Sequence, residues 1–196
     1  MEIVRPQSKQ PLPDHAKLVF KGKIFDVYQW EQEGYDGSLY IFEKIKRPDT
    51  VHIFAVTEQG NILVSHERQP GTEEYITPPG GRVDEGEDAL TAAKRELLEE
   101  TGYASENWEL LGAWQMHPKL EWAIFAFIAR NAKKVDAGAG VGFNNDEHIT
   151  SVEVSFDKLV EIVSSPDFYD RELRCRFLEA KLDPQKMAEL KKKILG

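Results

Sequence analysis

The chain has 196 residues, of which 41% are hydrophobic and 10% aromatic, and its formal net charge is −9. This length accommodates one domain with a full hydrophobic core, and no apolar run approaches the roughly 20 residues that a membrane-spanning helix needs. The acidic balance argues against a nucleic-acid partner, because phosphate backbones attract clustered Lys and Arg. We therefore expect no nucleic-acid and no membrane partner.

The single cysteine and the N-terminal residues bear on the cellular location of the protein. The one cysteine, Cys175, forms no disulfide within the chain, and residues 1–14 have neither the apolar core of a signal peptide nor the Arg-rich pattern of a transit peptide. A cytoplasmic location is expected.

The lysines at 191–193 fall in an amphipathic stretch and are interpreted as a solvated helix face rather than a binding patch.

The first third of the chain predicts extended structure. Residues 18–30 are rich in Val, Phe, Ile and Tyr and read as one strand, residues 35–38 carry an Asp-Gly turn signal, and residues 39–45 read as a returning strand. Together these segments predict a β-hairpin ahead of the main domain.

The rest of the chain alternates between strand and helix patterns around a dense turn signal, Pro78-Pro79-Gly80-Gly81. This order predicts an α/β or α+β fold with one central helix. Strands are expected at residues 51–56, 62–66, 108–116, 122–129 and 152–154, helices at 89–101, 156–163, 171–182 and 184–196, and a glycine-containing loop at 136–145.

Three acidic residues share one face of the central helix. Asp88 is a suitable N-cap and Gly102 a suitable stop, and i+3 and i+4 spacing projects Glu96, Glu99 and Glu100 from the same side. Like charges at i, i+4 cost an isolated helix roughly 0.2–0.5 kcal/mol per pair. Hard divalent cations such as Mg²⁺ and Mn²⁺ offset this repulsion, whereas the alternative is a solvated acidic face.

The residues around these acids follow a longer pattern. From Gly81 there are five free positions to Glu87, seven more to Arg95-Glu96-Leu97, one more to Glu99-Glu100, and one more to Gly102-Tyr103. Residue types and spacing resemble the signature of the Nudix hydrolase family. All seven positions that demand a particular Gly, Glu or Arg match, for which chance gives on the order of 10⁻⁸ per starting point. Tyr103 departs from the small aliphatic residue that is usual at the last position.

The resemblance implies an architecture for the whole chain. The family's fold is an α/β/α sandwich with a mixed sheet, here preceded by the hairpin. We expect residues 1–49 to form an N-terminal extension that serves dimerisation or substrate binding, residues 50–183 the hydrolase domain, and residues 184–196 a C-terminal helix.

The resemblance also implies a metal site that cuts a diphosphate bond. Mg²⁺ is the expected cofactor, with Mn²⁺ as a substitute, and Arg95 is expected to orient the glutamates. Glu87 would support the site or a further metal. The implied ligands are Glu96, Glu99, Glu100 and the carbonyl of Gly80.

The general base is sought outside the signature. In the ADP-ribose pyrophosphatase branch of the family it is often a glutamate on a late loop, and here that loop ends at Asn144-Asn145-Asp146-Glu147. Glu147 is the candidate and Asp146 the second choice, beside a box glutamate. A solvated loop acid is the alternative interpretation of Glu147.

Residues outside the signature bear on the identity of the substrate. Pro118, 15 residues beyond Tyr103, and Arg68 resemble substrate-contacting positions of the ADP-ribose pyrophosphatase branch, and the hairpin resembles its dimer element. The expectation is a homodimer that hydrolyses ADP-ribose to AMP and ribose 5-phosphate. Thr77 argues against it, because the branch usually has an acid there. Another nucleoside diphosphate sugar or a dinucleoside polyphosphate is the alternative. Trp30, Trp114 and Trp122 are candidates for base stacking or for core positions.

Three other classes of protein are alternatives to the hydrolase. A non-catalytic Nudix-fold binding module usually loses box carboxylates, and this chain keeps them. An isopentenyl diphosphate isomerase-like enzyme would use a cysteine, but Cys175 lies far from the box in sequence. A structural metal-binding protein leaves the Gly81-to-Glu87 spacing unexplained.

Overall fold

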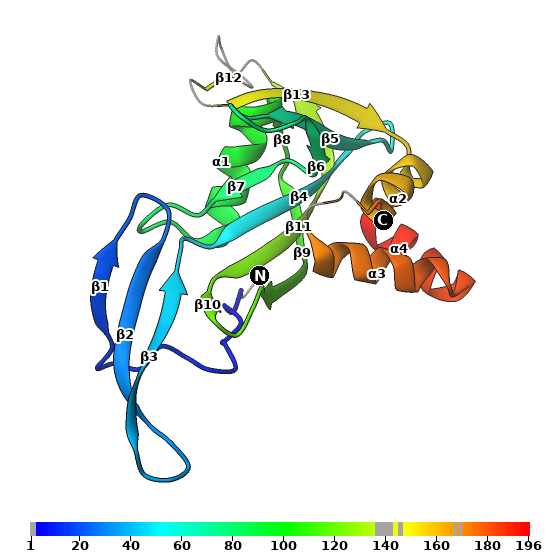
Figure 1. Cartoon of the computed structure of the whole chain (residues 1–196). Helices are drawn as coiled ribbons and strands as arrows, with labels where there is room; N and C mark the ends of the chain where they lie inside the picture. Colours follow the sequence, from blue (N-terminus) through cyan, green and yellow to red (C-terminus); the bar gives the residue numbers. More distant parts are fainter. Residues whose placement is uncertain (1–2, 136–142, 145–146, 167, 169) are drawn as a thin grey trace.

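The computed structural model describes residues 3–135, 143–144, 147–166, 168 and 170–196. Its strands form two sheets, a large mixed sheet in the body of the molecule and a smaller sheet that projects from it (Figure 1). Within the described residues, no helix is long and apolar enough to cross a membrane.

The centre of the large sheet is a parallel pair, β4 (Thr50–Thr57) and β11 (Ala123–Lys134). Both strands are mostly apolar, and their alternate apolar residues are buried on opposite faces. A strand that is covered on both faces has this composition, since neither set of side chains meets water. The parallel pair therefore marks the middle layer of the fold.

The other strands extend this pair to both sides. The sheet runs in the order β12-β13-β5-β4-β11-β8, with β6 on β5, β7 on β4, and β9 on β11. The two short strands β6 and β7 matter for the site, because they occupy the space where β4 and β5 diverge. The bounds are β5 Ile62–Arg68, β6 Tyr75–Thr77, β7 Gly80–Arg82, β8 Tyr103–Ala104, β9 Asn107–Gln115, β12 Phe143–Asn144 and β13 Glu147–Val154.

Helices cover the two faces of the large sheet unequally. Helix α1 (Ala89–Thr101) lies on one face, and α2 (Phe156–Ser164), α3 (Arg171–Lys181) and α4 (Pro184–Leu195) lie on the other (Figure 1). Each face has its own apolar core. The predicted three-layer α/β/α arrangement with a mixed sheet is confirmed.

The projecting sheet, called here the N-terminal sheet, differs in part from the prediction. It contains β1 (Lys17–Lys21), β2 (Asp26–Glu33), β3 (Leu39–Lys46) and the short β10 (Leu120–Glu121). The hairpin of β2 and β3 is confirmed, with Glu33 opposite Leu39.

The single strand expected at residues 18–30 is wrong, because the chain reverses between β1 and β2. Gly22 N–H donates to the Phe25 carbonyl at 3.0 Å. A Cβ atom at Gly22 would lie 2.5 Å from that carbonyl oxygen. The turn therefore depends on a glycine inside an otherwise strand-like stretch.

The strands around the predicted late loop are longer than expected. β13 begins at Glu147 instead of residue 152, and β11 continues to Lys134 beyond the expected end at 129. The extension of β11 passes Asn131, which has a φ of 54°. Asparagine tolerates this left-handed conformation better than most residues, and the pairing with β4 shifts register there. Most of the expected loop, residues 136–142 and 145, lies outside the described residues.

Candidate active site

Helix α1 begins and ends where its capping residues require. The Asp88 side chain accepts hydrogen bonds from the N–H groups of Leu90 and Thr91, and Gly102 has a φ of 70° and donates to the Leu98 carbonyl. Asp88 therefore satisfies N–H groups that the first turn leaves unpaired, and Gly102 adopts a left-handed conformation at little cost. The predicted helix and both of its caps are confirmed. The helix buries Ala92, Ala93 and Leu97 against the sheet, so its acidic face is fixed in orientation.

The Arg95 guanidinium joins the box carboxylates. Its Nη1 donates to Glu96 Oε1 at 2.8 Å and to Glu99 Oε2 at 3.2 Å. Its Nε and Nη2 donate to the two oxygens of Glu87 at 3.2 and 3.0 Å. Nη2 also donates to the Arg82 carbonyl at 2.9 Å, which ties the guanidinium to the end of β7. Arg95 thus holds three acidic side chains and the main chain together.

Two consecutive glycines bring β7 against the same carboxylates. Gly80 N–H donates to Glu100 Oε2 at 3.0 Å. A Cβ atom at Gly81 would lie 2.5 to 2.7 Å from the carboxylate atoms of Glu96, and one at Gly80 would lie 2.0 Å from the Val51 carbonyl oxygen. β7 therefore fills the space between β4 and α1 without room for a side chain.

The three acids around Arg95 differ in electrostatics. Burial raises the pKa of Glu96 above its usual range, although the adjacent Arg95 guanidinium opposes the rise. Hydrogen bonds from Arg95 lower the pKa of Glu87. These bonds in turn raise the pKa of Arg95, chiefly through Glu87. Burial thus disfavours the charged form of Glu96, and a further cation beside it would favour that form.

The donor set has the chemistry of a hard-cation site. It offers carboxylates on one helix face and main-chain oxygens at the adjacent β7, which are the ligands that Mg²⁺ and Mn²⁺ prefer. As arranged, no three carboxylate, imidazole or thiol groups of the described residues stand close enough together to hold a metal ion. Arg95 bonds both Glu96 and Glu99, and the Glu99 side chain is 60% exposed, so it has the freedom to reorient. The residues fit a divalent cation in kind and number.

Arg68 and the candidate base lie at one end of the sheet. Arg68 is exposed at the end of β5 and pairs in register with His148, the neighbour of Glu147. Only the backbone of Glu147 is described, as the first residue of β13, and Asp146 lies outside the described residues. The roles assigned to Arg68, Glu147 and Asp146 remain predictions.

Pro118 lies beside the N-terminal sheet. It is exposed in the turn before β10, which pairs with β3. The following Lys119 places its Nζ 3.6 Å from the centre of the Phe42 ring. The substrate role of Pro118 stays a prediction. The three tryptophans weighed for base stacking, Trp30, Trp114 and Trp122, are 5 to 8% exposed and occupy core positions.

The two departures from the family pattern have structural partners. Thr77 is buried in β6 opposite Ser65 of β5, two small side chains in a tightly packed position. The Tyr103 hydroxyl lies 3.0 Å from Glu153 Oε1 on β13, so the larger residue connects the end of α1 with that strand.

Sequence reasoning missed one contributor to the site, the Arg82 carbonyl, and one buried acid on the neighbouring strand β5, Glu67. The Arg82 carbonyl orients Arg95, but a main-chain acceptor leaves no signal in the sequence. Glu67, the middle residue of His66-Glu67-Arg68, is 9% exposed and accepts a hydrogen bond from the Tyr75 hydroxyl at 2.7 Å. A carboxylate at a strand position that is expected to be buried is the sequence signal for this residue.

Comparison with known proteins agrees with this geometry. A family model described as NUDIX domain matches residues 46–173. The chain is 29% identical to the ADP-ribose pyrophosphatase of Bacillus subtilis (strain 168), over 78% of this chain and 82% of that protein. It is 27% identical to the methanol dehydrogenase activator of Bacillus methanolicus, over 79% and 84%.

A solved structure supports the fold. A structure described as "Crystal structure of ADP compounds hydrolase" superposes with a TM-score of 0.66 and 20% sequence identity, and covers 92% of this chain and 98% of that one. The matched family segment contains the whole of α1, β7 and the Arg95 cluster. With well over half of its length matched by the family model, the chain belongs to the Nudix hydrolase family.

Proposed function

We propose that this Nudix hydrolase uses Mg²⁺, with Mn²⁺ as a substitute, to cleave the diphosphate bond of ADP-ribose into AMP and ribose 5-phosphate. The observation that carries the proposal is the set of box carboxylates held on one face of α1 by Arg95 and the two glycines. The similarity to an ADP-ribose pyrophosphatase over most of both chains supports the choice of substrate.

The reaction adds water across a phosphoanhydride. The water oxygen becomes part of one phosphate, the bridging oxygen leaves with the other, and protons pass to solvent. A bound divalent cation supplies charge neutralisation on the phosphate oxygens and orientation of the water. Glu96, Glu99, Glu100 and the Gly80 carbonyl would hold that cation.

The remaining residues have supporting roles in this proposal. Arg95, which Glu87 holds through both carboxylate oxygens, keeps the acidic face in one orientation. Glu147 would accept the proton of the attacking water, with Asp146 as the second candidate. Arg68 would contact a phosphate, and Pro118 would shape the substrate-binding turn.

A coupled phosphate-release assay tests the proposal. Alkaline phosphatase frees inorganic phosphate from AMP and ribose 5-phosphate but not from intact ADP-ribose, so the signal appears only after cleavage. We expect Mg²⁺-dependent release from ADP-ribose above that from GDP-mannose, NADH and diadenosine polyphosphates, which are assayed the same way. Nucleoside triphosphates are tested by direct product separation. A stronger signal from another compound would overturn the substrate, and inertness toward all of them would favour the non-catalytic binding module.

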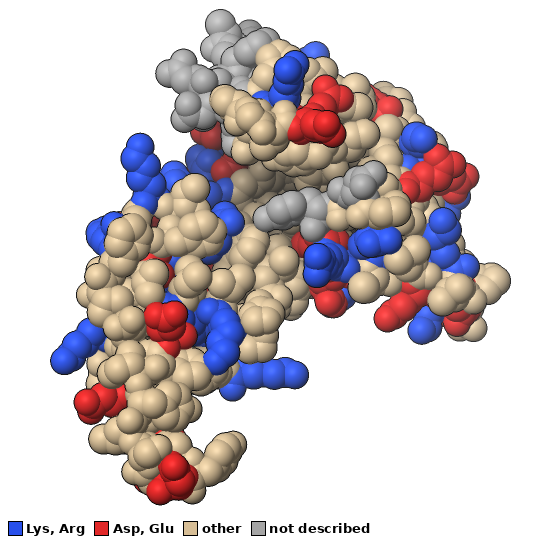
Figure 2. All heavy atoms as spheres, viewed as in Figure 1, with Lys and Arg blue, Asp and Glu red and all other residues tan. Residues whose placement is uncertain are grey.

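We also propose a homodimer formed through the N-terminal sheet. Phe20, Leu39, Ile41 and Ile45 point to one face of that sheet and are 39 to 65% exposed. Figure 2 shows charged side chains of both signs over the projecting sheet, with uncharged surface between them. The same face carries the exposed Glu31, Glu33 and Glu43, so the apolar side chains form a patch bordered by acids. An exposed apolar patch of this kind favours association with a second copy.

Light scattering after size-exclusion chromatography tests the dimer. The Ile41→Glu variant should run as a monomer at concentrations where the wild type is a dimer, because it places a charge in the apolar face. Lys23→Glu, outside the paired strands, is the control. A monomeric wild type would contradict the dimer and leave the hydrolase proposal intact. The cytoplasmic location and the absence of a nucleic-acid partner stay predictions.

A further inference from the structure

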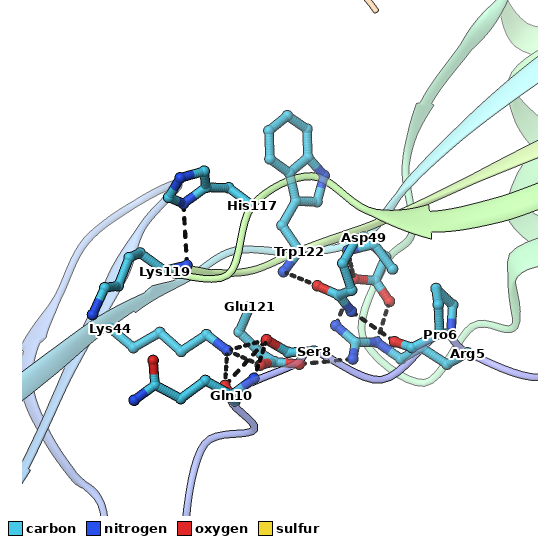
Figure 3. A network of polar contacts seen from close by, with 12 residues as sticks. Arg5, Pro6, Ser8, Gln10, Lys44, Asp49, His117, Lys119, Glu121 and Trp122 are labelled. Carbon is cyan, nitrogen blue, oxygen red and sulfur yellow. Dashed lines mark hydrogen bonds and ion pairs between the residues drawn. The ribbon is translucent and has the colours of Figure 1, made fainter. Parts of the chain in front are cut away.

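The segment at residues 3–10 runs along the junction between the two sheets, and Arg5 lies in that segment (Figure 3). Its Nε and Nη2 donate to the two Asp49 carboxylate oxygens at 2.7 and 3.0 Å. Its Nη1 donates to Glu121 Oε1 at 2.8 Å. All three guanidinium nitrogens are therefore engaged by carboxylates that lie 44 and 116 positions away along the chain.

Lys44 completes this group, which we call the junction network: Arg5, Lys44, Asp49 and Glu121. The Lys44 side chain is 1% exposed, and its Nζ lies 2.7 Å from Glu121 Oε2. It also donates to the Ser8 hydroxyl and to the Gln10 carbonyl. Two cations thus neutralise two carboxylates whose side chains are only 13 and 17% exposed.

Asp49 connects the junction network with the box. One of its carboxylate oxygens accepts from Ala123 N–H at 2.8 Å, at the start of β11. Its carbonyl accepts from Val83 N–H at 2.8 Å, immediately after β7. The residue that Arg5 holds therefore sets the start of β4 against both β11 and the strand that carries Gly80 and Gly81.

The packing of β7 passes any displacement of Asp49 on to the carboxylates. β7 has three residues, which pair with Thr50 to His52 directly after Asp49. It has no room for a Cβ atom toward Val51 on one side or toward Glu96 on the other. Closely packed groups move together, so a shift at Asp49 changes the position of Gly80 and the space left for Glu96.

A cavity beside the junction network gives Asp49 room to move. Its volume is about 430 Å³, and Arg5, Asp49, Val83 and Glu121 are among its lining residues. Without Arg5, Lys44 would be the one remaining cation of the network beside two carboxylates. Their mutual repulsion would then push Asp49 toward this space.

We propose that Arg5 is a positioning residue of the metal site, which acts through Asp49 and β7 on Gly80 and Glu96. The inference rests on the proposed metal-dependent function and extends it to a residue outside the matched family segment, residues 46–173. It predicts that the affinity for a divalent cation depends on the N-terminal segment even though that segment holds no ligand.

Binding of Mn²⁺ alone to the full-length protein, measured from the electron paramagnetic resonance signal of free Mn²⁺, tests the inference without substrate or turnover. The Arg5→Gln variant should bind Mn²⁺ about tenfold more weakly, the effect typical of residues that orient metal ligands. Arg5→Lys should fall in between, because one ammonium group replaces a forked guanidinium. Arg171→Gln, an exposed arginine at the start of α3, is the matched control and should bind as the wild type does.

A double-mutant cycle separates positioning from general stabilisation. If Arg5 acts through Asp49, the Arg5→Gln, Asp49→Asn double variant should bind Mn²⁺ no more weakly than the worse single variant. Wild-type affinity in a folded but less stable Arg5→Gln variant would overturn the inference, as would additive losses in the cycle. Should Arg5→Gln fail to fold, Arg5→Lys carries the same comparison. A wild type that binds no Mn²⁺ would contradict the proposed function itself.

Discussion

The acidic face of α1 and the junction network are both groups of carboxylates held by basic side chains, but they arise from the sequence differently. Arg95, Glu96 and Glu99 lie on α1, Glu87 lies directly before its N-cap, and the capped helix sets the spacing of the first three. In the junction network, Arg5, Lys44, Asp49 and Glu121 come from four separate segments. Local spacing is enough to build the first group, whereas the second exists only after the two sheets have formed.

Burial does not separate the two groups as a whole, because Glu87 and Glu96 are 12 and 13% exposed and Glu121 and Asp49 are 13 and 17% exposed. The contrast lies in single members. The side chains of Glu99 and Arg95 are 60 and 28% exposed, whereas that of Lys44 is 1% exposed. An exposed carboxylate is free to meet a ligand, and a buried lysine is held by partners that compensate its desolvation. The comparison therefore teaches that Glu99 on the acidic face is free to reorient, whereas Lys44 in the junction network is fixed by its partners between the two sheets.

The largest expected effect is on catalysis and tests the box. The Glu100→Gln variant should lose on the order of 10³-fold in kcat, because charge stabilisation of several kcal/mol at a metal site is removed. Its urea unfolding midpoint should stay close to that of the wild type. Glu106→Gln, an exposed glutamate just beyond the box, is the control and should keep full activity. Undiminished Mg²⁺-dependent turnover in Glu100→Gln would show that the metal-site assignment is wrong.

The next effect is on stability and tests the junction. The Lys44→Met variant should lower the free energy of unfolding by about 3 kcal/mol, because it leaves Glu121 partly uncompensated in a buried position. Urea denaturation gives this value directly. Lys46→Met, two residues along and exposed, should change it little. If Lys44→Met unfolds with the wild-type midpoint, the two regions do not differ in the way proposed.

The smallest effect is a pH dependence of stability. Burial alone would raise the pKa of Glu121, but hydrogen bonds from Lys44 and Arg5 outweigh it and lower that pKa. The folded state thus binds this proton less readily than the unfolded state does. The stabilisation is present above the unfolded pKa, near 4.3, and is lost as the pH falls through the lower folded value.

The Glu121→Gln variant isolates this contribution. Between about pH 5 and pH 3, spanning the usual glutamate pKa, the urea midpoint of the wild type should fall more steeply than that of Glu121→Gln. Glu106→Gln should follow the wild type. Parallel curves for the wild type and Glu121→Gln would mean that the charge of Glu121 does not stabilise the folded protein.

The parts of the molecule that depend on local sequence could be predicted. Asp88 and Gly102 bound α1 as expected, and the apolar runs at residues 51–56 and 122–129 predicted the strands β4 and β11. Spacing alone placed Glu96, Glu99 and Glu100 on one face. The order of strands and helices predicted a mixed α/β or α+β fold, and the resemblance to the Nudix family supplied the three-layer arrangement.

The parts that depend on distant contacts could not be predicted. Nothing near Lys44 or Glu121 indicates that the two meet across 77 positions, and Arg5 lies in a proline-containing stretch with no pattern. The split of residues 18–30 depends on Gly22, because a Cβ atom there would collide with the Phe25 carbonyl oxygen. No turn motif marks this position in the sequence. The early start of β13 follows from the pairing of Glu147 with Asn144 of β12 and of His148 onward with β5, which single-strand patterns do not reveal.

The two adjacent glycines of β7 have different consequences for mutational tolerance. A methyl group at position 80 would meet a backbone oxygen of β4, which has no freedom to give way, so substitution there would damage the fold. The nearest atoms to a methyl group at position 81 would be those of the Glu96 carboxylate, the end of a side chain that can turn aside more readily than a backbone oxygen. In a laboratory selection that scores expression, position 81 would therefore accept other residues, while position 80 would remain glycine. A selection that scores turnover would hold both, so the difference between the two experiments would separate the needs of the fold from those of the chemistry.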